Sequence, residues 1–190
     1  MVAPTATERH LELLDDLVEL FLAEGFASFT LGDLATRLRC SKTTLYALGR
    51  NKEQLTAGAV RHFFRTATAF VEERTAAQDD PAERIVVYLR AVADALRPAS
   101  AQFMADLADH PAAAEVYERN TAAAAERVRR LIAEGVDAGD FRAVHAAFVA
   151  DTVAATMTRI QSGAVLRNTG LHDAEAYEEL AALVLGGVRR

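Results

Sequence analysis

Apolar residues recur three and four positions apart along most of this chain, and no segment keeps the alternation of a β-strand. That spacing places apolar side chains on one face of an α-helix. Alanine is abundant and only four prolines are present, so helices are favoured over strands. The pattern predicts an all-α protein.

The first predicted helix runs from Arg9 to Glu24, and Gly25 is placed to end it in the left-handed conformation. Thr30 followed by Asp33 is the spacing of a capping box, which predicts a second helix of about two turns. The apolar stripe of the first helix is made of Leu13, Leu14, Leu17, Val18, Phe21 and Leu22.

A third short helix is expected after Ser41, which can cap it, with Leu45 facing inward. Asn51, with Gln54 three residues later, predicts a fourth and long helix that ends near Ala77. Two short helices joined by a tight turn form a helix-turn-helix, whose second helix enters the major groove of DNA by its first residues. The free N–H groups at the start of the fourth helix suit a phosphate.

Charge is distributed unevenly within the N-terminal third. The whole chain has a net charge of −6, but residues 37–65 contain seven bases against one acid, whereas residues 1–36 contain seven acids against one base. Salt screens charges more than ~10 Å apart, so a phosphate beside the basic segment is attracted by the local charge. The alternative interpretation of the basic segment is an ordinary solvated helix face.

The segment LFLAEGFASFTLGDLATRLRCSKTTLYALGRNKEQL resembles the TetR (tetracycline-repressor-like) family of bacterial transcription regulators. The likeness covers roughly Leu11 to Val60 and consists of a helix, EGF, T-x-x-D-L-A, S-K-x-T-L-Y and N-K-E-x-L in this order. It implies a helix-turn-helix DNA-binding domain over residues 1–52 and a helical ligand-binding and dimerisation domain over residues 53–190.

The same resemblance implies which residues contact DNA. Lys42, Thr43 and Thr44 would face bases or the nearby backbone, and Tyr46 and Lys52 would contact phosphates. Arg39 and Arg50 belong to the same basic segment and complete the predicted set. Cations that flank a helix rich in hydroxyls are suited to hold phosphates while the helix reads bases.

The chain departs from the family pattern at two places. Arg39 stands where the family usually has a glycine in the turn, and arginine tolerates a positive φ poorly, so we expect a different turn geometry. Ala47, Leu48 and Gly49 replace an aromatic cluster, so we expect fewer contacts with the DNA backbone.

Five further helices are expected in the C-terminal two thirds, over residues 82–96, 101–108, 111–136, 143–166 and 173–188, with Asp173 capping the last. The last two long helices carry small and apolar residues suited to a symmetric four-helix dimer contact, unless these residues only fill the monomer core. These residues are Ala146, Ala147, Val149, Ala150, Val153, Ala154, Met157, Leu180, Leu183 and Val184.

A ligand pocket is expected among the middle helices. In the family's mechanism, a small molecule bound there moves the fourth helix and changes the separation of the two DNA-reading helices. Plain core packing is the alternative for every residue of this set. The predicted lining is Tyr88, Val92, Phe103, Met104, Leu107, Tyr117, Phe148, Met157 and Ile160.

These observations favour a ligand-responsive DNA-binding regulator, more specifically a repressor that binds a palindromic operator as a homodimer. The alternative is an all-helical interaction module without sequence-specific DNA binding. The five histidines lack metal-site spacing, and no nucleophile motif is present, so we expect no enzyme activity, metal or cofactor. A single cysteine excludes an internal disulfide, and the N-terminus lacks the pattern of a signal peptide, so we expect a cytoplasmic protein without membrane partners.

Overall fold

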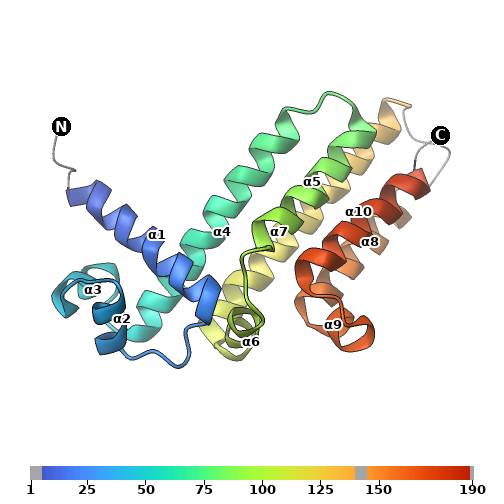
Figure 1. Cartoon of the computed structure of the whole chain (residues 1–190). Coiled ribbons are helices and arrows are strands. Elements are labelled where there is room, and N and C mark those ends of the chain that lie inside the picture. The colour runs from blue at the N-terminus through green and yellow to red at the C-terminus, as the bar shows by residue number, and fades with distance from the viewer. Residues whose placement is uncertain (1–5, 140–144, 189–190) are drawn as a thin grey trace. The chain divides into compact units, whose positions relative to one another are not determined.

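The structure is a computed structural model that describes residues 6–139 and 145–188, and its regular secondary structure in these ranges is all α-helix (Figure 1). The all-α prediction is confirmed. The helices are α1 (Ala6–Glu24), α2 (Leu31–Arg37), α3 (Lys42–Leu48), α4 (Lys52–Ala76), α5 (Pro81–Leu96), α6 (Ala101–Asp109), α7 (Pro111–Asp137), α8 (Ala146–Gln161), α9 (Ala164–Thr169) and α10 (Asp173–Val188).

The chain divides into two compact units, which we call unit 1 and unit 2. Unit 1 comprises the chain up to Arg65 together with Ala99–Val116, so it contains α1 to α3, the first half of α4, and α6. Unit 2 comprises Thr66–Pro98 and the chain from Tyr117 onward, and it contains the second half of α4, α5, most of α7, and α8 to α10. The domain boundary predicted after residue 52 places α6 in the second domain. Packing groups α6 with the N-terminal helices instead.

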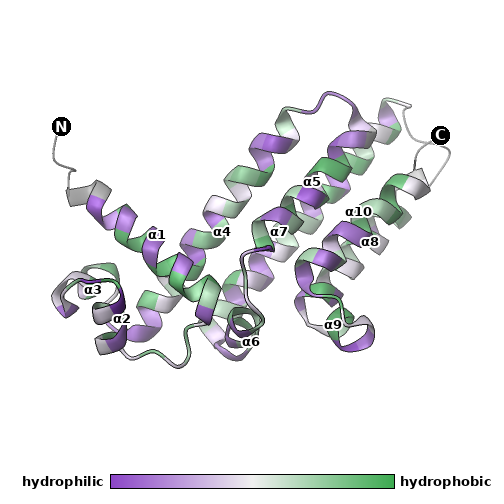
Figure 2. Cartoon of the chain, in the orientation of Figure 1, coloured by the Kyte–Doolittle hydropathy of each residue, from purple (hydrophilic) through white to green (hydrophobic). Residues whose placement is uncertain are grey.

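Unit 1 is built on the apolar stripe predicted for α1. Phe21 of this stripe is buried, and its ring lies 5.4 Å from that of Phe26. Phe26 in turn meets Phe103 of α6 edge to face at 6.0 Å. Leu34 of α2 and Leu45 of α3 are each at most 1 % exposed, so both short helices bury one side against this core. Figure 2 shows apolar segments alternating with polar ones along α1, as expected of an amphipathic helix.

Unit 2 is a bundle in which α10 packs closely against α5 and also contacts α8. Ile85 and Leu89 of α5 are fully buried, as are Met157 of α8 and Ala181 of α10. Because the side chain of Ala181 is small, the backbone of α10 can approach the neighbouring helix closely. None of the helices within the described ranges is long and apolar enough to cross a membrane.

Two predicted boundaries in unit 2 are wrong. The helix expected over residues 143–166 is broken after Gln161, because Gly163 adopts a left-handed conformation (φ 68°) that ends α8 and begins the separate helix α9. Its expected first residues, 143 and 144, lie outside the described residues. Asp173 does not cap α10 but is its first residue, and its carboxylate accepts a hydrogen bond from Tyr117 instead.

Candidate nucleic-acid interface

The two short helices begin at the caps that the sequence predicts. The N–H of Asp33 donates to Thr30 Oγ1 (3.2 Å), and the N–H of Thr30 donates to Asp33 Oδ2 (2.8 Å), which completes a capping box. The N–H of Thr44 donates to Ser41 Oγ (3.0 Å) at the start of α3. These caps satisfy backbone donors that a helix leaves free, and they set where α3 begins.

The turn between α2 and α3 keeps a left-handed residue although it lacks the glycine. Arg39 has φ 49°, and it is the single non-glycine residue with positive φ in the part of the chain that the structure describes. The N–H groups of Arg39 and of Cys40 donate to Thr36 O (3.2 Å) and Ala35 O (3.0 Å), which holds this conformation. The expected change of turn geometry is therefore wrong: arginine adopts the left-handed conformation, at an energetic cost of about 1 kcal/mol.

Arg39→Gly is expected to stabilise the protein by about 0.5–1 kcal/mol, because glycine relieves the strain but also loses more entropy on folding. Denaturant unfolding of both proteins measures the difference. Arg39→Ala is the matched control, since it removes the same charge and keeps the strain. Equal stability of the glycine and alanine variants would contradict the assignment of strain.

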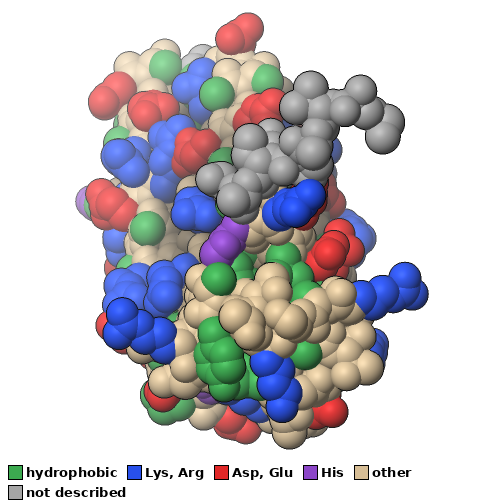
Figure 3. Space-filling view, turned by 90° about the vertical axis from the view of Figure 1, so that its left-hand side faces the viewer, with side chains coloured by type: hydrophobic (Ala, Val, Ile, Leu, Met, Phe, Trp, Pro, Cys, Tyr) green, Lys and Arg blue, Asp and Glu red, His purple; other side chains and the backbone are tan. Residues whose placement is uncertain are grey.

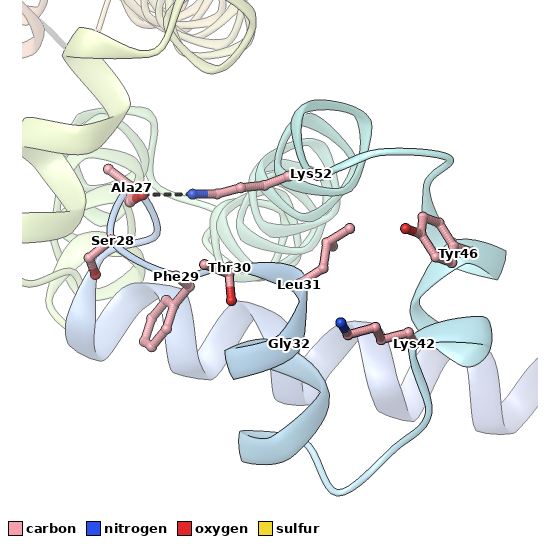
Figure 4. Close-up of a pocket in the computed structure, with 9 residues that line it drawn as sticks. All are labelled: Ala27, Ser28, Phe29, Thr30, Leu31, Gly32, Lys42, Tyr46 and Lys52. Carbon is pink, nitrogen blue, oxygen red and sulfur yellow. Dashed lines mark hydrogen bonds between the residues drawn. The ribbon is translucent and has the colours of Figure 1, made fainter.

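An open groove of about 520 Å³ lies where the starts of α2, α3 and α4 meet (Figure 4). In this view Lys42 and Tyr46 extend from α3, and Lys52 reaches across from the first turn of α4. The groove contains both lysines of the chain. It is lined by Ala27, Ser28, Phe29, Thr30, Leu31, Gly32, Lys42, Tyr46 and Lys52.

Positive charge dominates this groove. Two hydrogen bonds from Thr30 hold the pKa of the Asp33 carboxyl below its usual range, and the charges of Lys42 and Lys52 lower it further. The charges of both lysines therefore act on the same carboxyl group, in the first turn of α2. Lys52 Nζ uses one of its three donors on Ala27 O (2.6 Å), which leaves two for a ligand.

The start of α4 matches the prediction. The N–H of Gln54 donates to Asn51 Oδ1 (2.8 Å), so Asn51 caps the helix, and the N–H of Arg50 donates to Gln54 Oε1 (3.2 Å). Lys52 is the first residue of this helix, whose free N–H groups also favour an anion.

The residues predicted to contact DNA are accessible. Arg39, Lys42, Thr43, Thr44 and Arg50 are exposed, Tyr46 is 48 % exposed, and Lys52 is half-buried. Leu45, expected to face the core, is 1 % exposed. Thr44 Oγ1 lies 2.8 Å from Ser41 Oγ, so it is already hydrogen-bonded, whereas Thr43 is exposed. In Figure 3, the side of the molecule on which α3 lies in Figure 1 carries several Lys and Arg side chains that stand out from the surface.

Asp106 of α6 is a component of this region that sequence reasoning missed. It is 6 % exposed, and its Oδ2 accepts from the N–H groups of Phe26 (2.5 Å) and Ala27 (2.8 Å), while Gln102 Nε2 donates to its Oδ1 (2.7 Å). Gly25, with φ 77°, makes room for it, since a Cβ there would lie 2.5 Å from Oδ2. Through Ala27, whose C=O binds Lys52, the carboxylate positions the α1–α2 loop beside the groove.

The predicted ligand contacts fall into three groups. Tyr88, Tyr117, Met157 and Ile160 are buried and Val92 is half-buried, all in unit 2. Phe103 and Leu107 are buried and Met104 is half-buried, all on α6 in unit 1. The expected interior position of Phe148 is wrong, because Phe148 is 70 % exposed. It lies nine residues before Met157, which is two and a half helical turns, so the two side chains point in opposite directions.

Most residues of the predicted dimer face also lie elsewhere than expected. Ala150, Val153, Ala154, Met157, Leu180 and Val184 are buried within the chain, so for them the core alternative is correct. Leu183, at 71 % exposed, and Phe148 are the large apolar side chains that these two helices leave exposed in the described ranges. Helical periodicity shows two apolar stripes on a small-residue helix but does not show which one faces inward.

No family model matches the chain, and no curated protein does. Solved structures do match it over nearly its whole length. A regulator from Saccharomonospora viridis in complex with choline has a TM-score of 0.73 at 16 % identity, covering 97 % of this chain and 99 % of that one. A TetR-family regulator from Cytophaga hutchinsonii has a TM-score of 0.72 at 18 % identity with full coverage of both chains.

A third solved structure, the ketosteroid regulator KstR2 of Mycobacterium tuberculosis, has a TM-score of 0.59 at 20 % identity and covers both chains fully. The chain therefore has the fold of TetR-family transcriptional regulators, as the resemblance of its N-terminal segment implied. Identities at this level show a shared fold and leave the function to be argued from the sites.

Proposed function

We propose that the protein is a ligand-responsive transcription regulator that binds a palindromic operator as a homodimer and acts as a repressor. The observation that carries this proposal is the groove in which Lys42, Tyr46 and Lys52 converge beside the exposed first turn of α3. Two cations and a phenol around one open space fit a phosphate of the DNA backbone. Thr43 and the Lys42 stem then lie where a base edge would be read.

An interaction module that uses the helix-turn-helix only for packing is the rival function. Packing requires Leu45 and Leu34, but it gives no reason for both lysines of the chain to line the same open groove. Lysine is otherwise absent from this protein, which uses arginine on the rest of its surface. The placement of the two lysines therefore favours DNA.

Dimerisation is proposed through α8 and α10. These helices contact one another and are joined through α9, so Phe148 near the start of α8 and Leu183 near the end of α10 belong to the same end of the hairpin. Exposed apolar side chains on a helical hairpin are suited to a twofold contact that forms four helices. A dimer presents two reading helices to successive major grooves about 34 Å apart, which requires an operator of nearly palindromic sequence.

An effector site is proposed in unit 2, and a small, largely apolar molecule bound there would release the DNA. Tyr88, Tyr117, Met157 and Ile160 are buried there, and aromatic and thioether side chains commonly line small-molecule sites. The neighbour with choline supports an effector role for this fold. The effector acts by binding the DNA-incompetent state more tightly than the competent one.

The proposed DNA contacts are tested by binding to duplex fragments, beginning with the DNA next to the protein's own gene, over a series of salt concentrations. Lys52→Ala and Tyr46→Ala are expected to weaken binding to all sequences alike, and Lys52→Ala to reduce the slope of log affinity against log salt by about 1. Lys42→Ala is expected to lose specific binding as well.

Arg90→Ala is the control variant, because Arg90 is an exposed cation of unit 2 and the proposal gives it no role. It should bind all fragments as the unchanged protein does. Equal binding by the three groove variants and the control would support the interaction module instead.

A further inference from the structure

Three of the four tyrosines of the chain are buried in unit 2, and one of them binds a half-buried carboxylate, that of Asp173. Tyr117 of α7 donates its hydroxyl to Asp173 Oδ2 (2.8 Å), and Tyr177 lies one turn after Asp173 on the same face of α10. Tyr88 lies on α5, the helix against which α10 packs most closely. Tyr88, Tyr117 and Tyr177 are 4, 5 and 2 % exposed.

The polar groups of this cluster are incompletely satisfied. Tyr88 and Tyr177 form no hydrogen bond through their hydroxyls within the described residues, and no Lys, Arg or His of that part of the chain forms an ion pair with Asp173. Thr56 Oγ1 is the one fully enclosed side-chain oxygen or nitrogen without a partner in the described ranges, so the two phenol oxygens each keep a small accessible surface. Polar groups that the protein leaves without a partner but open to small molecules can be satisfied by a bound ligand.

The electrostatics of the cluster agree with its geometry. Burial raises the pKa of Asp173 above its usual range, and the hydrogen bond from Tyr117 only partly opposes this. Burial also raises the pKa of Tyr177, with further contributions from the charges of Asp173 and of Tyr88, so the phenols are neutral and can donate hydrogen bonds. The charge of His172 acts on Asp173 and those of Arg127 and Arg130 act on Tyr88, but within the described residues Asp173 forms no ion pair, and Arg127 pairs with Glu72 and Glu134 instead.

We propose that Asp173, Tyr117, Tyr177 and Tyr88 form the binding site for a small organic cation with an apolar skeleton, and that this cation is the effector. The carboxylate would pair with its charged nitrogen, and the electron-rich faces of the phenol rings would contact the surrounding alkyl groups. A metal ion does not fit, because the described residues contain no group of three or more His, Cys, Asp or Glu side chains that could hold one. The inference rests on the proposed effector site of unit 2 and specifies its chemistry.

The charge of the ligand is tested with a pair of probes that share one carbon skeleton. 3,3-Dimethylbutan-1-amine is a cation at neutral pH and 3,3-dimethylbutan-1-ol is not, and tetramethylammonium serves as a second cation. The chain has no tryptophan, so its intrinsic fluorescence comes mainly from tyrosine, and three of the four tyrosines belong to the site. The cations are expected to change this fluorescence saturably, and the alcohol to bind roughly tenfold more weakly or worse.

Asp173→Asn is expected to reduce the affinity for the amine at least about tenfold and to leave that for the alcohol unchanged, because asparagine still accepts the Tyr117 hydrogen bond. Tyr177→Leu, which removes a ring face and keeps apolar volume, is expected to weaken both cations. Asp109→Asn is the control, since Asp109 is an exposed carboxylate of unit 1, and it should bind them as the unchanged protein does. Circular dichroism verifies that each variant is folded.

Equal binding of amine and alcohol, undiminished binding of the amine by Asp173→Asn, or no saturable response to either cation would overturn the proposal. All these titrations are made without DNA. Failure of the cation site is therefore distinguishable from failure of the proposed regulatory function, which is measured by DNA binding of the same preparation without probe.

Discussion

Leu183→Glu is expected to make the protein monomeric and to weaken its binding to a duplex operator by at least about 100-fold, or about 2.7 kcal/mol. Leu183 is 71 % exposed, so the substitution leaves the core of the subunit intact. In a twofold contact the change occurs in both subunits, and each would bury a carboxylate at a cost of several kcal/mol. A monomer holds only one reading helix and contacts half an operator.

The subunit mass in solution and the affinity for DNA are measured on the same preparation. Phe70→Glu is the matched control, because Phe70 is also an exposed apolar residue of unit 2 but lies on α4. The new carboxylate can pair with Arg74, one turn later. A Leu183→Glu protein that stays dimeric would show that α8 and α10 do not form the contact.

Asp106→Ala is expected to lower the free energy of unfolding by about 3 kcal/mol, because it leaves the N–H groups of Phe26 and Ala27 without their charged acceptor. It is also expected to weaken DNA binding about tenfold, because the loop that it releases supplies the Ala27 carbonyl that holds Lys52. Asp109→Ala is the control, since Asp109 is an exposed carboxylate on the same helix.

Both effects are needed to support the role given to Asp106. If Asp106→Ala is destabilised but binds DNA with unchanged affinity under conditions in which it is fully folded, Asp106 contributes to stability alone. It would then have no part in positioning the groove.

The same carboxylate gives a pH dependence of defined sign. Burial by itself raises the pKa of Asp106, but the N–H groups of Ala27 and Phe26, the Gln102 amide and the charge of Lys52 together hold this pKa below its usual range. A depressed pKa means that the stabilisation is complete above the ordinary value of about 4 and is lost as the pH falls through the lower folded value. Acid unfolding of Asp106→Asn should therefore show a weaker dependence on pH in this range than that of the unchanged protein.

The sequence predicted the N-terminal helices well, because their ends carry local signals. Thr30 with Asp33, Ser41 and Asn51 each bind a backbone N–H within three residues, so their partners are adjacent in the chain. Gly25 ended α1 for the same kind of reason. Arg39 shows the limit of such signals, since hydrogen bonds of the turn imposed a conformation that the residue type disfavours.

The components that the sequence did not reveal depend on contacts between distant segments. Asp106 binds the backbone of residues about 80 positions earlier, and no local pattern distinguishes it from Asp109. Tyr117 and Asp173 are 56 residues apart, and no local pattern marks Tyr177 as a neighbour of Tyr117. Phe148 and Ala150 differ by only two positions, yet one faces solvent and the other the core, because two positions span more than half a helical turn.

Selection of bound sequences from a pool of random duplexes tests whether the protein reads DNA as a symmetric dimer. The unchanged protein is expected to enrich one inverted repeat, with half-site centres about 34 Å apart or a multiple of that distance, and the variant with both Lys42→Ala and Lys52→Ala is expected to enrich none. Retention of the pool without enrichment of any sequence, equally by the unchanged and the doubly substituted protein, would contradict this expectation.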